Sequence, residues 1–258
     1  AFIPEGLLPA VTLSLALAVQ KMAKEHALVK KLSAVETLGC TNVICSDKTG
    51  TLTQNEMTVN RLWMIHGEMT VTGEGYGPEG EIRDRDTVVT VRKSSALRLL
   101  LSGGALCSNA RLLPPEEGKK RYTVLGDPTE ACLGVVARKG GMDLERLFQE
   151  FPRVRELPFD SVRKRMTTIH QLREPVDGSS RIAFVKGAPM EVLELCSRCY
   201  EGNASRAMEQ SDRERIREAN DRYAREGLRV LAVACRLLRR EDETLPSSLR
   251  EYTPETLE

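Results

Sequence analysis

A short strand-like stretch that ends in an aspartate limits the fold of this chain more than any other feature. The residues Thr41–Cys45 are mostly apolar or β-branched, and Asp47 follows them at the head of a polar, turn-like run. We interpret this as a buried strand and turn of an α/β fold, where ligands bind at the carboxyl ends of strands. An aspartate there can attack a phosphoryl group. Lys48, Thr49 and Thr51 could position the phosphate and neutralise its charge.

Composition indicates an ordinary globular chain. With 258 residues, 41% of them hydrophobic, the chain is long enough for one large or two modest cores. Because 38 basic residues balance 37 acidic ones, we expect no nucleic-acid partner. The seven cysteines are scattered and odd in number, which favours a reducing, cytosolic setting. The opening residues do not resemble a signal peptide, and we expect the chain to be part of a longer protein.

The first apolar run has two interpretations. Leu7 to Val19 is apolar apart from Thr12 and Ser14, and basic residues follow it from Lys21. The run is too short to span a membrane alone, since about 20 apolar residues are needed. It is either a buried helix or the cytoplasmic half of a membrane helix, and the run by itself does not decide between them.

The rest of the chain alternates strand, turn and helix patterns. Met57 to Ile65 and Met69 to Thr72 predict a hairpin, and Gly73 to Asp86 and Pro114 to Arg121 predict loops. The remaining predictions are helices at Ser94 to Leu106, from Asp127 to about Arg138, at Pro189 to Cys196 and at Glu209 to Glu226, and strands at Arg181 to Lys186 and Leu228 to Cys235.

The run Asp47-Lys-Thr-Gly-Thr-Leu-Thr53 resembles the phosphorylation signature of the P-type ATPases, within the haloacid-dehalogenase-like superfamily. Further stretches are similar to other signatures of that family, in the family's order. Ile3 to Leu7 resembles the unwound, ion-binding segment of the fourth membrane helix. Three stretches resemble the signatures of the nucleotide-binding domain. They are Phe159 with Lys164, Lys186-Gly-Ala-Pro and Leu228-Arg-Val-Leu-Ala. Lys30 to Gly39 and Thr41 to Thr58 resemble the stalk and the first phosphorylation-domain strand of the calcium and sodium pumps.

The resemblance implies a role for each matching residue, with ATP and Mg²⁺ as the cofactors. In the phosphorylation site it implies phosphorylation of Asp47, with Lys48, Thr49 and Thr51 assisting, and magnesium on Asp47 and Thr49. For ATP it implies Glu130 on the adenine amino group, Phe159 stacked on the base, Lys164 and Lys186 lining the pocket, and Arg229 at the ribose-phosphate part. Glu5 is implied for the transported ion. Ser161 stands where calcium pumps often carry an arginine, so that phosphate contact is not implied for this chain.

Each nucleotide residue also has a structural alternative. Glu130 could complete a capping box with Asp127, alone or together with an adenine contact. Phe159 could belong to the core. Lys164, between two arginines, could be part of a solvated basic face. Arg229 could be a strand-edge residue. Lys186 is explained least well by packing, because an apolar strand delivers it onto a Gly-Ala-Pro turn.

The expected fold is α/β: an α+β nucleotide-binding domain with an antiparallel sheet and flanking helices, inserted in an incomplete haloacid-dehalogenase-like phosphorylation domain. The expected divisions are 1–31 for the end of a membrane helix and stalk, 32–59 for the first part of the phosphorylation domain, 60–239 for the nucleotide-binding domain and 240–258 for a return linker. Such a chain would lie at the cytoplasmic face of a membrane. Its partners would be ATP and the rest of the pump: actuator domain, membrane helices and second half of the phosphorylation domain.

Two other functions stay open at this point. The chain could act only as an ATP-binding module, because it lacks the Gly-Asp-Gly segment that completes the magnesium site in the family. It could also be a soluble phosphatase of the same superfamily. Such phosphatases commonly have a second aspartate two residues after the first, where this chain has Thr49, and this difference favours the pump.

Overall fold

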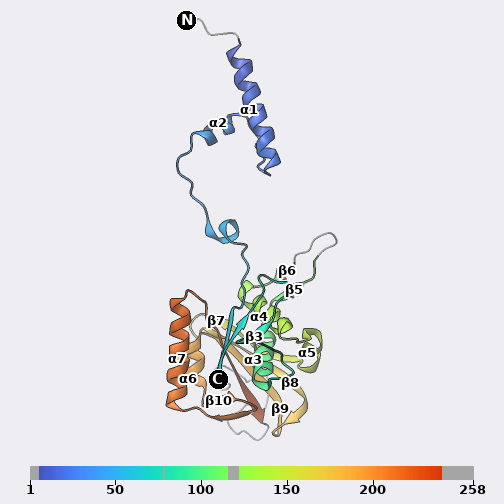
Figure 1. The fold of residues 1–258 in the computed structure, drawn as a ribbon. Helices are drawn as coiled ribbons and strands as arrows, with labels where there is room; N and C mark the ends of the chain where they lie inside the picture. The colour runs from blue at the N-terminus through green and yellow to red at the C-terminus, as the bar shows by residue number, and fades with distance from the viewer. Residues whose placement is uncertain (1–5, 78, 116–121, 240–258) are drawn as a thin grey trace. The chain divides into compact units, whose positions relative to one another are not determined.

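The computed structural model describes residues 6–77, 79–115 and 122–239, and the chain divides into two compact units, Ala1–Gln54 and Asn55–Glu258 (Figure 1). The predicted domain divisions at residues 31, 59 and 239 stay predictions. Glu5, most of the loop predicted at Pro114 to Arg121 and the linker after residue 239 lie outside the described residues.

The described residues of the first unit form two α-helices and one tight turn. Helix α1 spans Leu7–Lys24, α2 spans Ser33–Gly39, and the turn η1 spans Lys48–Leu52. No residue of α1 is buried, so the alternative of a buried helix is wrong for this structure. By length and composition alone, α1 could cross a membrane.

The strand predicted at Thr41 to Cys45 is wrong. Residues 41–47 form no regular element and are exposed. A strand is stable only when a neighbouring strand pairs with its backbone N–H and C=O groups. Among the described residues of the first unit, no other strand is present to do so.

Antiparallel sheets form the frame of the second unit. The larger sheet has the order β12-β9-β8-β7, and a four-stranded meander has the order β1-β2-β3-β4. Two smaller hairpins pair β5 with β6 and β10 with β11. The strands are β1 Arg61–Met64, β2 Gly67–Val71, β3 Ile82–Asp84, β4 Thr87–Val89, β5 Arg111–Leu113, β6 Thr123–Leu125, β7 Arg153–Asp160, β8 Arg165–Val176, β9 Ser179–Gly187, β10 Arg198–Glu201, β11 Ala204–Ala207 and β12 Ala232–Arg239. The expected mixture of helices with antiparallel sheets is thus confirmed.

The structure corrects three predicted segments. The hairpin β1–β2 forms as expected, although β1 is shorter than the predicted strand. The predicted loop from Gly73 to Asp86 contains strand β3, which pairs with both β2 and β4. The last strand begins at Ala232 rather than Leu228. Propensity does not fix such boundaries, because pairing with neighbouring strands decides where a strand starts.

The helices of the second unit begin where the sequence offers caps. The hydroxyl of Ser94 accepts a hydrogen bond from the Leu97 amide, and the carboxylate of Asp127 accepts one from the Thr129 amide. These caps start α3 and α4, and both helices begin where the sequence predicted a helix. The helices are α3 Ser95–Leu106, α4 Pro128–Lys139, α5 Leu144–Glu150, α6 Pro189–Leu195 and α7 Gln210–Arg225.

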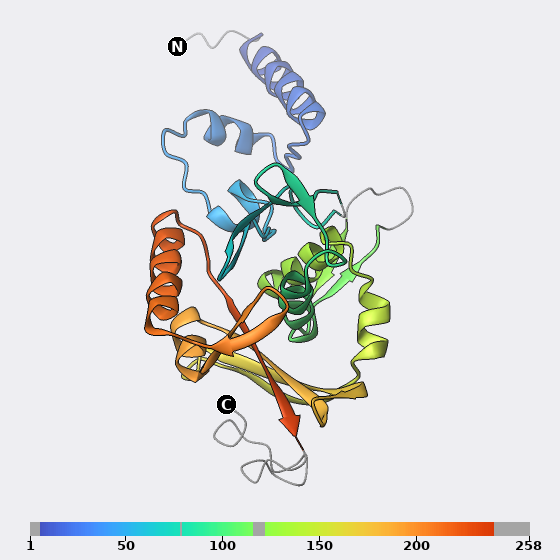
Figure 2. The ribbon, with the colours of Figure 1, turned by 60° about the horizontal axis from the view of Figure 1, so that its bottom comes forward.

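The main core lies between the two four-stranded sheets, where α3 and α4 pack (Figure 2). Leu62 and Ile82 of the meander, Leu101 of α3, and Met166 and Phe184 of the larger sheet all belong to this cluster. Helix α3 contacts both β9 and β12. Helix α6 also contacts these two strands, and it packs against α7. This packing carries the end of α3, the start of α4 and the end of β9 to one place, where the candidate site lies.

Candidate functional site

Lys186 occupies the end of β9 and is almost fully buried. Its cross-strand neighbours are Met166 on β8 and Val233 on β12. The next residue, Gly187, has no space for a side chain, because a Cβ atom would lie 2.5 Å from the Lys164 carbonyl oxygen. Glycine therefore allows the end of β9 to approach the turn between β7 and β8.

A buried ion pair joins Lys186 to the first turn of α4. The Nζ atom of Lys186 lies 2.7 Å from Oε1 of Glu130, and the two side chains are 7% and 19% exposed. The other carboxylate oxygen of Glu130 accepts a hydrogen bond from the Asn109 amide at 2.7 Å. Glu130 thus does not form a capping box with Asp127, and that alternative is wrong. Its carboxylate faces Lys186 because the buried lysine needs a counter-charge.

A hydrogen-bonded network extends from this pair to β7. Asn109 Nδ2 donates to Oε1 of Glu156 at 2.8 Å, and Oδ1 of Asn109 accepts from Arg153 Nη1 at 2.5 Å. Arg153 also bonds Oε2 of Glu156 and the carbonyl oxygens of Leu106 and Ser108. This network was not predicted from the sequence. No local pattern links residues more than 40 positions apart, and β7 itself was not predicted.

Phe159 lies on the surface rather than in the core. Its side chain is 62% exposed. The pairing of β7 with β8 is irregular between Leu157 and Asp160, and Phe159 lies within this irregular stretch. The alternative that Phe159 belongs to the core is therefore wrong. An exposed aromatic ring of this size is free to stack on a planar ligand.

Lys164 closes the turn that follows Phe159. The carboxylate of Asp160 accepts hydrogen bonds from the amides of Val162 and Arg163, and Lys164 has a positive φ of 52°. Nζ of Lys164 lies 2.5 Å from Oε1 of Glu191 in α6. This hydrogen bond raises the pKa of Lys164 and lowers the pKa of Glu191. Lys164 is thus exposed but already has a specific acidic partner.

Arg229 lies just before β12 and is exposed, and its charge acts on Asp127 at the start of α4. Burial would raise the pKa of Asp127, but hydrogen bonds from Thr129 and the charge of Arg229 outweigh it, so the pKa is lowered. Burial raises the pKa of Cys132 to about 11, against the opposing charges of Lys186 and Arg229. The first turn of α4 therefore lies within the electrostatic field of Lys186 and Arg229.

The residues around Asp47 belong to the first unit. Asp47 is exposed, and the chain turns tightly after it, with Gly50 at a φ of 78°. The Thr53 hydroxyl accepts from the Gly50 amide and donates to the Lys48 carbonyl oxygen. The described residues contain no group of three or more His, Cys, Asp or Glu side chains that could hold a metal. Asp47 and Thr49 offer too few ligands to hold magnesium by themselves.

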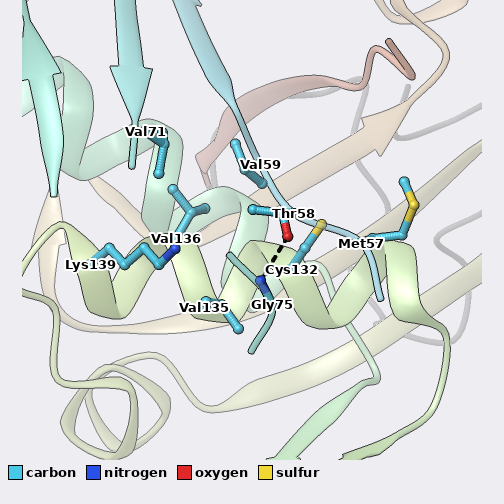
Figure 3. A pocket seen from close by; sticks show the side chains of 9 residues that line it. All are labelled: Met57, Thr58, Val59, Val71, Gly75, Cys132, Val135, Val136 and Lys139. Atoms are coloured by element: carbon cyan, nitrogen blue, oxygen red, sulfur yellow. Dashed lines mark hydrogen bonds between the residues drawn. The ribbon is translucent and has the colours of Figure 1, made fainter. Parts of the chain in front are cut away.

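A separate small pocket lies under the meander, beside α4 (Figure 3). The Thr58 hydroxyl accepts a hydrogen bond from the Gly75 amide at one side, and Lys139 closes the other by donating to the Thr72 and Gly73 carbonyl oxygens. The pocket has no room for a water molecule. The hydrogen bonds around the pocket join two segments of the core, and the pocket is not a ligand site.

Comparison with known proteins places these residues in a family context. Residues 96–257 match the family model described as "P-type ATPase, cytoplasmic domain N". The chain is 44% identical over 231 residues to the "Probable cation-transporting ATPase F" of Mycobacterium tuberculosis, covering 89% of this chain and 24% of that protein. It is 41% identical over 237 residues to the "Calcium-transporting ATPase" of Bacillus subtilis, covering 92% and 26%. A human "Calcium-transporting ATPase type 2C member 1" is 39% identical, with 91% and 24% covered. The chain spans about a quarter of the length of these relatives.

Proposed function

This chain belongs to the P-type ATPases, in the family of their cytoplasmic N domain, and on that premise we propose that its second unit binds ATP. The observation that carries the proposal is the buried Lys186–Glu130 pair at the end of β9, where β9 meets the turn that follows the exposed Phe159. A cation, a carboxylate and a free aromatic face are the groups that recognise a purine nucleotide.

Each binding residue has a defined task in this proposal. Phe159 stacks on the adenine, and a free lone pair of Glu130 accepts a hydrogen bond from the adenine amino group. Lys186 and Lys164 line the pocket, and Arg229 reaches the ribose-phosphate part. Lys164 must then share its charge between the ligand and Glu191.

In the whole protein we assign Asp47 the role of phosphate acceptor. Its carboxylate attacks the γ-phosphorus of ATP, the bond to the bridging oxygen breaks, and ADP leaves. Lys48, Thr49 and Thr51 hold the transferred phosphoryl group. Asp47 and Thr49 would hold magnesium together with ligands from the rest of the pump, and the bound ion would neutralise charge on the phosphate groups.

The remaining proposals concern the whole pump. Residues 32–59 are the first part of a haloacid-dehalogenase-like phosphorylation domain into which the N domain, residues 60–239, is inserted. Residues 240–258 are the linker that returns to that domain. Residues 1–31 are the end of a membrane helix and its stalk, and Glu5 contacts the transported cation. The second unit then lies at the cytoplasmic face of the membrane.

The test of nucleotide binding is a calorimetric titration of ATP into the chain and two variants. Phe159→Ala should weaken binding about tenfold, since stacking on an aromatic side chain contributes about 1–3 kcal/mol per base. Val162→Ala is the matched control, because Val162 is 86% exposed in the neighbouring turn. Equal affinities for all three proteins would contradict the proposed pocket.

The alternative of an ATP-binding module without chemistry is favoured by the small set of ligands near Asp47. Incubation of this chain with γ-labelled ATP and magnesium decides between the two. Label that Asp47→Asn abolishes would show phosphorylation by the chain alone. Saturable binding without label would support a module that depends on the rest of the pump for the transfer step.

A further inference from the structure

Arg153 lies at the centre of the hydrogen-bonded network beside the proposed nucleotide pocket, but it is not one of the binding residues named above. We propose that Arg153 is a positioning residue that sets the base selectivity of this site, acting through Asn109 on the carboxylate of Glu130. The inference rests on the proposed function, in which Glu130 meets the adenine amino group.

The first step is the hold that Arg153 has on the end of α3. Its Nη2 atom donates to the carbonyl oxygens of Leu106 and Ser108, each at 2.6 Å. The last carbonyl groups of a helix lack partners within the helix and carry the negative end of its dipole. The guanidinium satisfies the carbonyl of Leu106, the last residue of α3, and that of Ser108 just beyond it, which fixes the path of the chain as it leaves the helix.

The second step is the side chain of Asn109. Its Oδ1 accepts from Arg153 Nη1, and its Nδ2 donates to Glu156, which in turn bonds Arg153 at 3.0 Å. These three side chains form a closed set in which each one fixes the other two. The planar fork of arginine makes this possible, since one guanidinium bonds two carbonyls, an amide and a carboxylate together.

The third step connects this set to Glu130. With its side chain fixed, Asn109 presents its backbone amide to Oε2 of Glu130, and Lys186 holds Oε1. The carboxylate is therefore held at both oxygens, and each oxygen keeps one further lone pair. Loosening of Asn109 would leave only Lys186 to orient the carboxylate.

The orientation of Glu130 affects only the contact with the amino group of adenine. Adenine presents an amino group that can donate to a carboxylate, whereas hypoxanthine presents an oxygen at the same position. Loss of a fixed carboxylate should therefore weaken ATP binding and leave ITP binding unchanged. A residue that only stabilises the fold would affect both nucleotides equally.

The experiment measures the dissociation constants of ATP and ITP, with magnesium, for the full chain and its variants. Arg153→Gln and Asn109→Ala should each lower the preference for ATP over ITP about tenfold, equivalent to about 1.4 kcal/mol, with an unchanged constant for ITP. Arg153→Lys keeps the charge without the fork and should behave like Arg153→Gln. Arg146→Gln is the matched control, because Arg146 pairs with Glu150 one turn along α5 and is 74% exposed.

Each outcome supports or overturns the inference. A lowered ATP to ITP ratio in the Arg153 and Asn109 variants, but not in Arg146→Gln, supports it. Equal weakening of both nucleotides, or an unchanged ratio in a chain whose ATP binding still depends on Phe159, overturns it and leaves the proposed function intact. A parent chain that binds no ATP overturns both. If Arg153→Gln does not fold, Asn109→Ala decides, because it keeps the bonds from Arg153 to the helix end.

Discussion

At the scale of single residues, the contribution of Lys186 to stability depends on Glu130, and that of Glu130 depends on Lys186. Removing one partner of a buried ion pair leaves an uncompensated charge, which costs about 3–5 kcal/mol. Lys186→Met should therefore lower the free energy of unfolding by about 3 kcal/mol, near the lower limit because Glu130 is partly exposed. Adding Glu130→Gln to Lys186→Met should restore part of that loss, since the unpaired carboxylate is then removed.

Urea unfolding of the two single variants and the double variant measures this coupling. Arg83 and Glu81 form an exposed ion pair on the meander and serve as the control cycle, with an expected coupling below about 1 kcal/mol. Additive effects of Lys186→Met and Glu130→Gln would contradict a direct interaction between the two side chains.

His170 makes the stability of the second unit depend on pH. Its ring is buried, with Nδ1 at 2.9 Å from the Phe151 carbonyl oxygen and Nε2 at 2.9 Å from the Thr168 hydroxyl. Burial lowers the pKa of His170 to about 4, from the usual 6.5. Between these values the unfolded chain binds a proton that the folded chain does not, so stability falls as the pH falls.

The expected loss between pH 7 and pH 5 is about 2 kcal/mol, at about 1.4 kcal/mol for each pH unit below 6.5. Urea unfolding at both pH values measures it. His170→Gln lowers stability at both pH values but should remove most of the difference between them. If that variant keeps the full pH dependence, other groups cause it.

At the scale of the elements, the packing of α3 on the larger sheet depends on one glycine. A Cβ atom on Gly103 would lie 2.7 Å from Cγ1 of Val233 and 2.8 Å from Cδ1 of Phe184. Gly103→Ala should therefore push α3 from the sheet and destabilise the unit by about 1–3 kcal/mol. The neighbouring Gly104 has its nearest contact at 3.8 Å. Gly104→Ala should stabilise the same helix by up to about 1 kcal/mol, because alanine favours the helix.

Thermal or urea unfolding of the two variants measures this difference. The free energy of unfolding should fall in Gly103→Ala and rise in Gly104→Ala, although the chemical change is the same. A stabilising Gly103→Ala would mean that α3 packs less closely on β9 and β12 than the structure has it. ATP affinity should also fall in Gly103→Ala, because α3 ends in the segment that carries Asn109.

At the scale of the whole molecule, the buried clusters belong entirely to the second unit. All residues of the three hydrophobic clusters lie between positions 55 and 239, and the described residues of α1, α2 and η1 include none that is buried. A chain of residues 55–239 should therefore fold by itself, with a melting temperature within about 2 °C of the parent and the same affinity for ATP. Calorimetry of both chains measures this. A fall of more than about 5 °C would show that the first unit stabilises the second.

Local signals in the sequence determined the elements that need no distant partner. The caps Ser94 and Asp127 started α3 and α4 where predicted, and the hairpin β1–β2 formed about its expected turn. Hydrogen bonds within one helix or one hairpin satisfy most of the backbone there, so a short stretch of sequence is sufficient. The motif resemblance likewise led to the family, because its residues keep their order along the chain.

Only the tertiary structure decided where strands pair and how the candidate site is arranged. Thr41–Cys45 has strand-like residues but no partner among the described residues, whereas β7 pairs with β8 despite Pro158 within it. The choice between capping and pairing for Glu130 depended on Lys186, which lies 56 positions along the chain. Arg153 acts on carbonyl groups that no sequence pattern marks. Pairing, burial and counter-charge are interactions between distant segments, so they are fixed only when the chain brings those segments together.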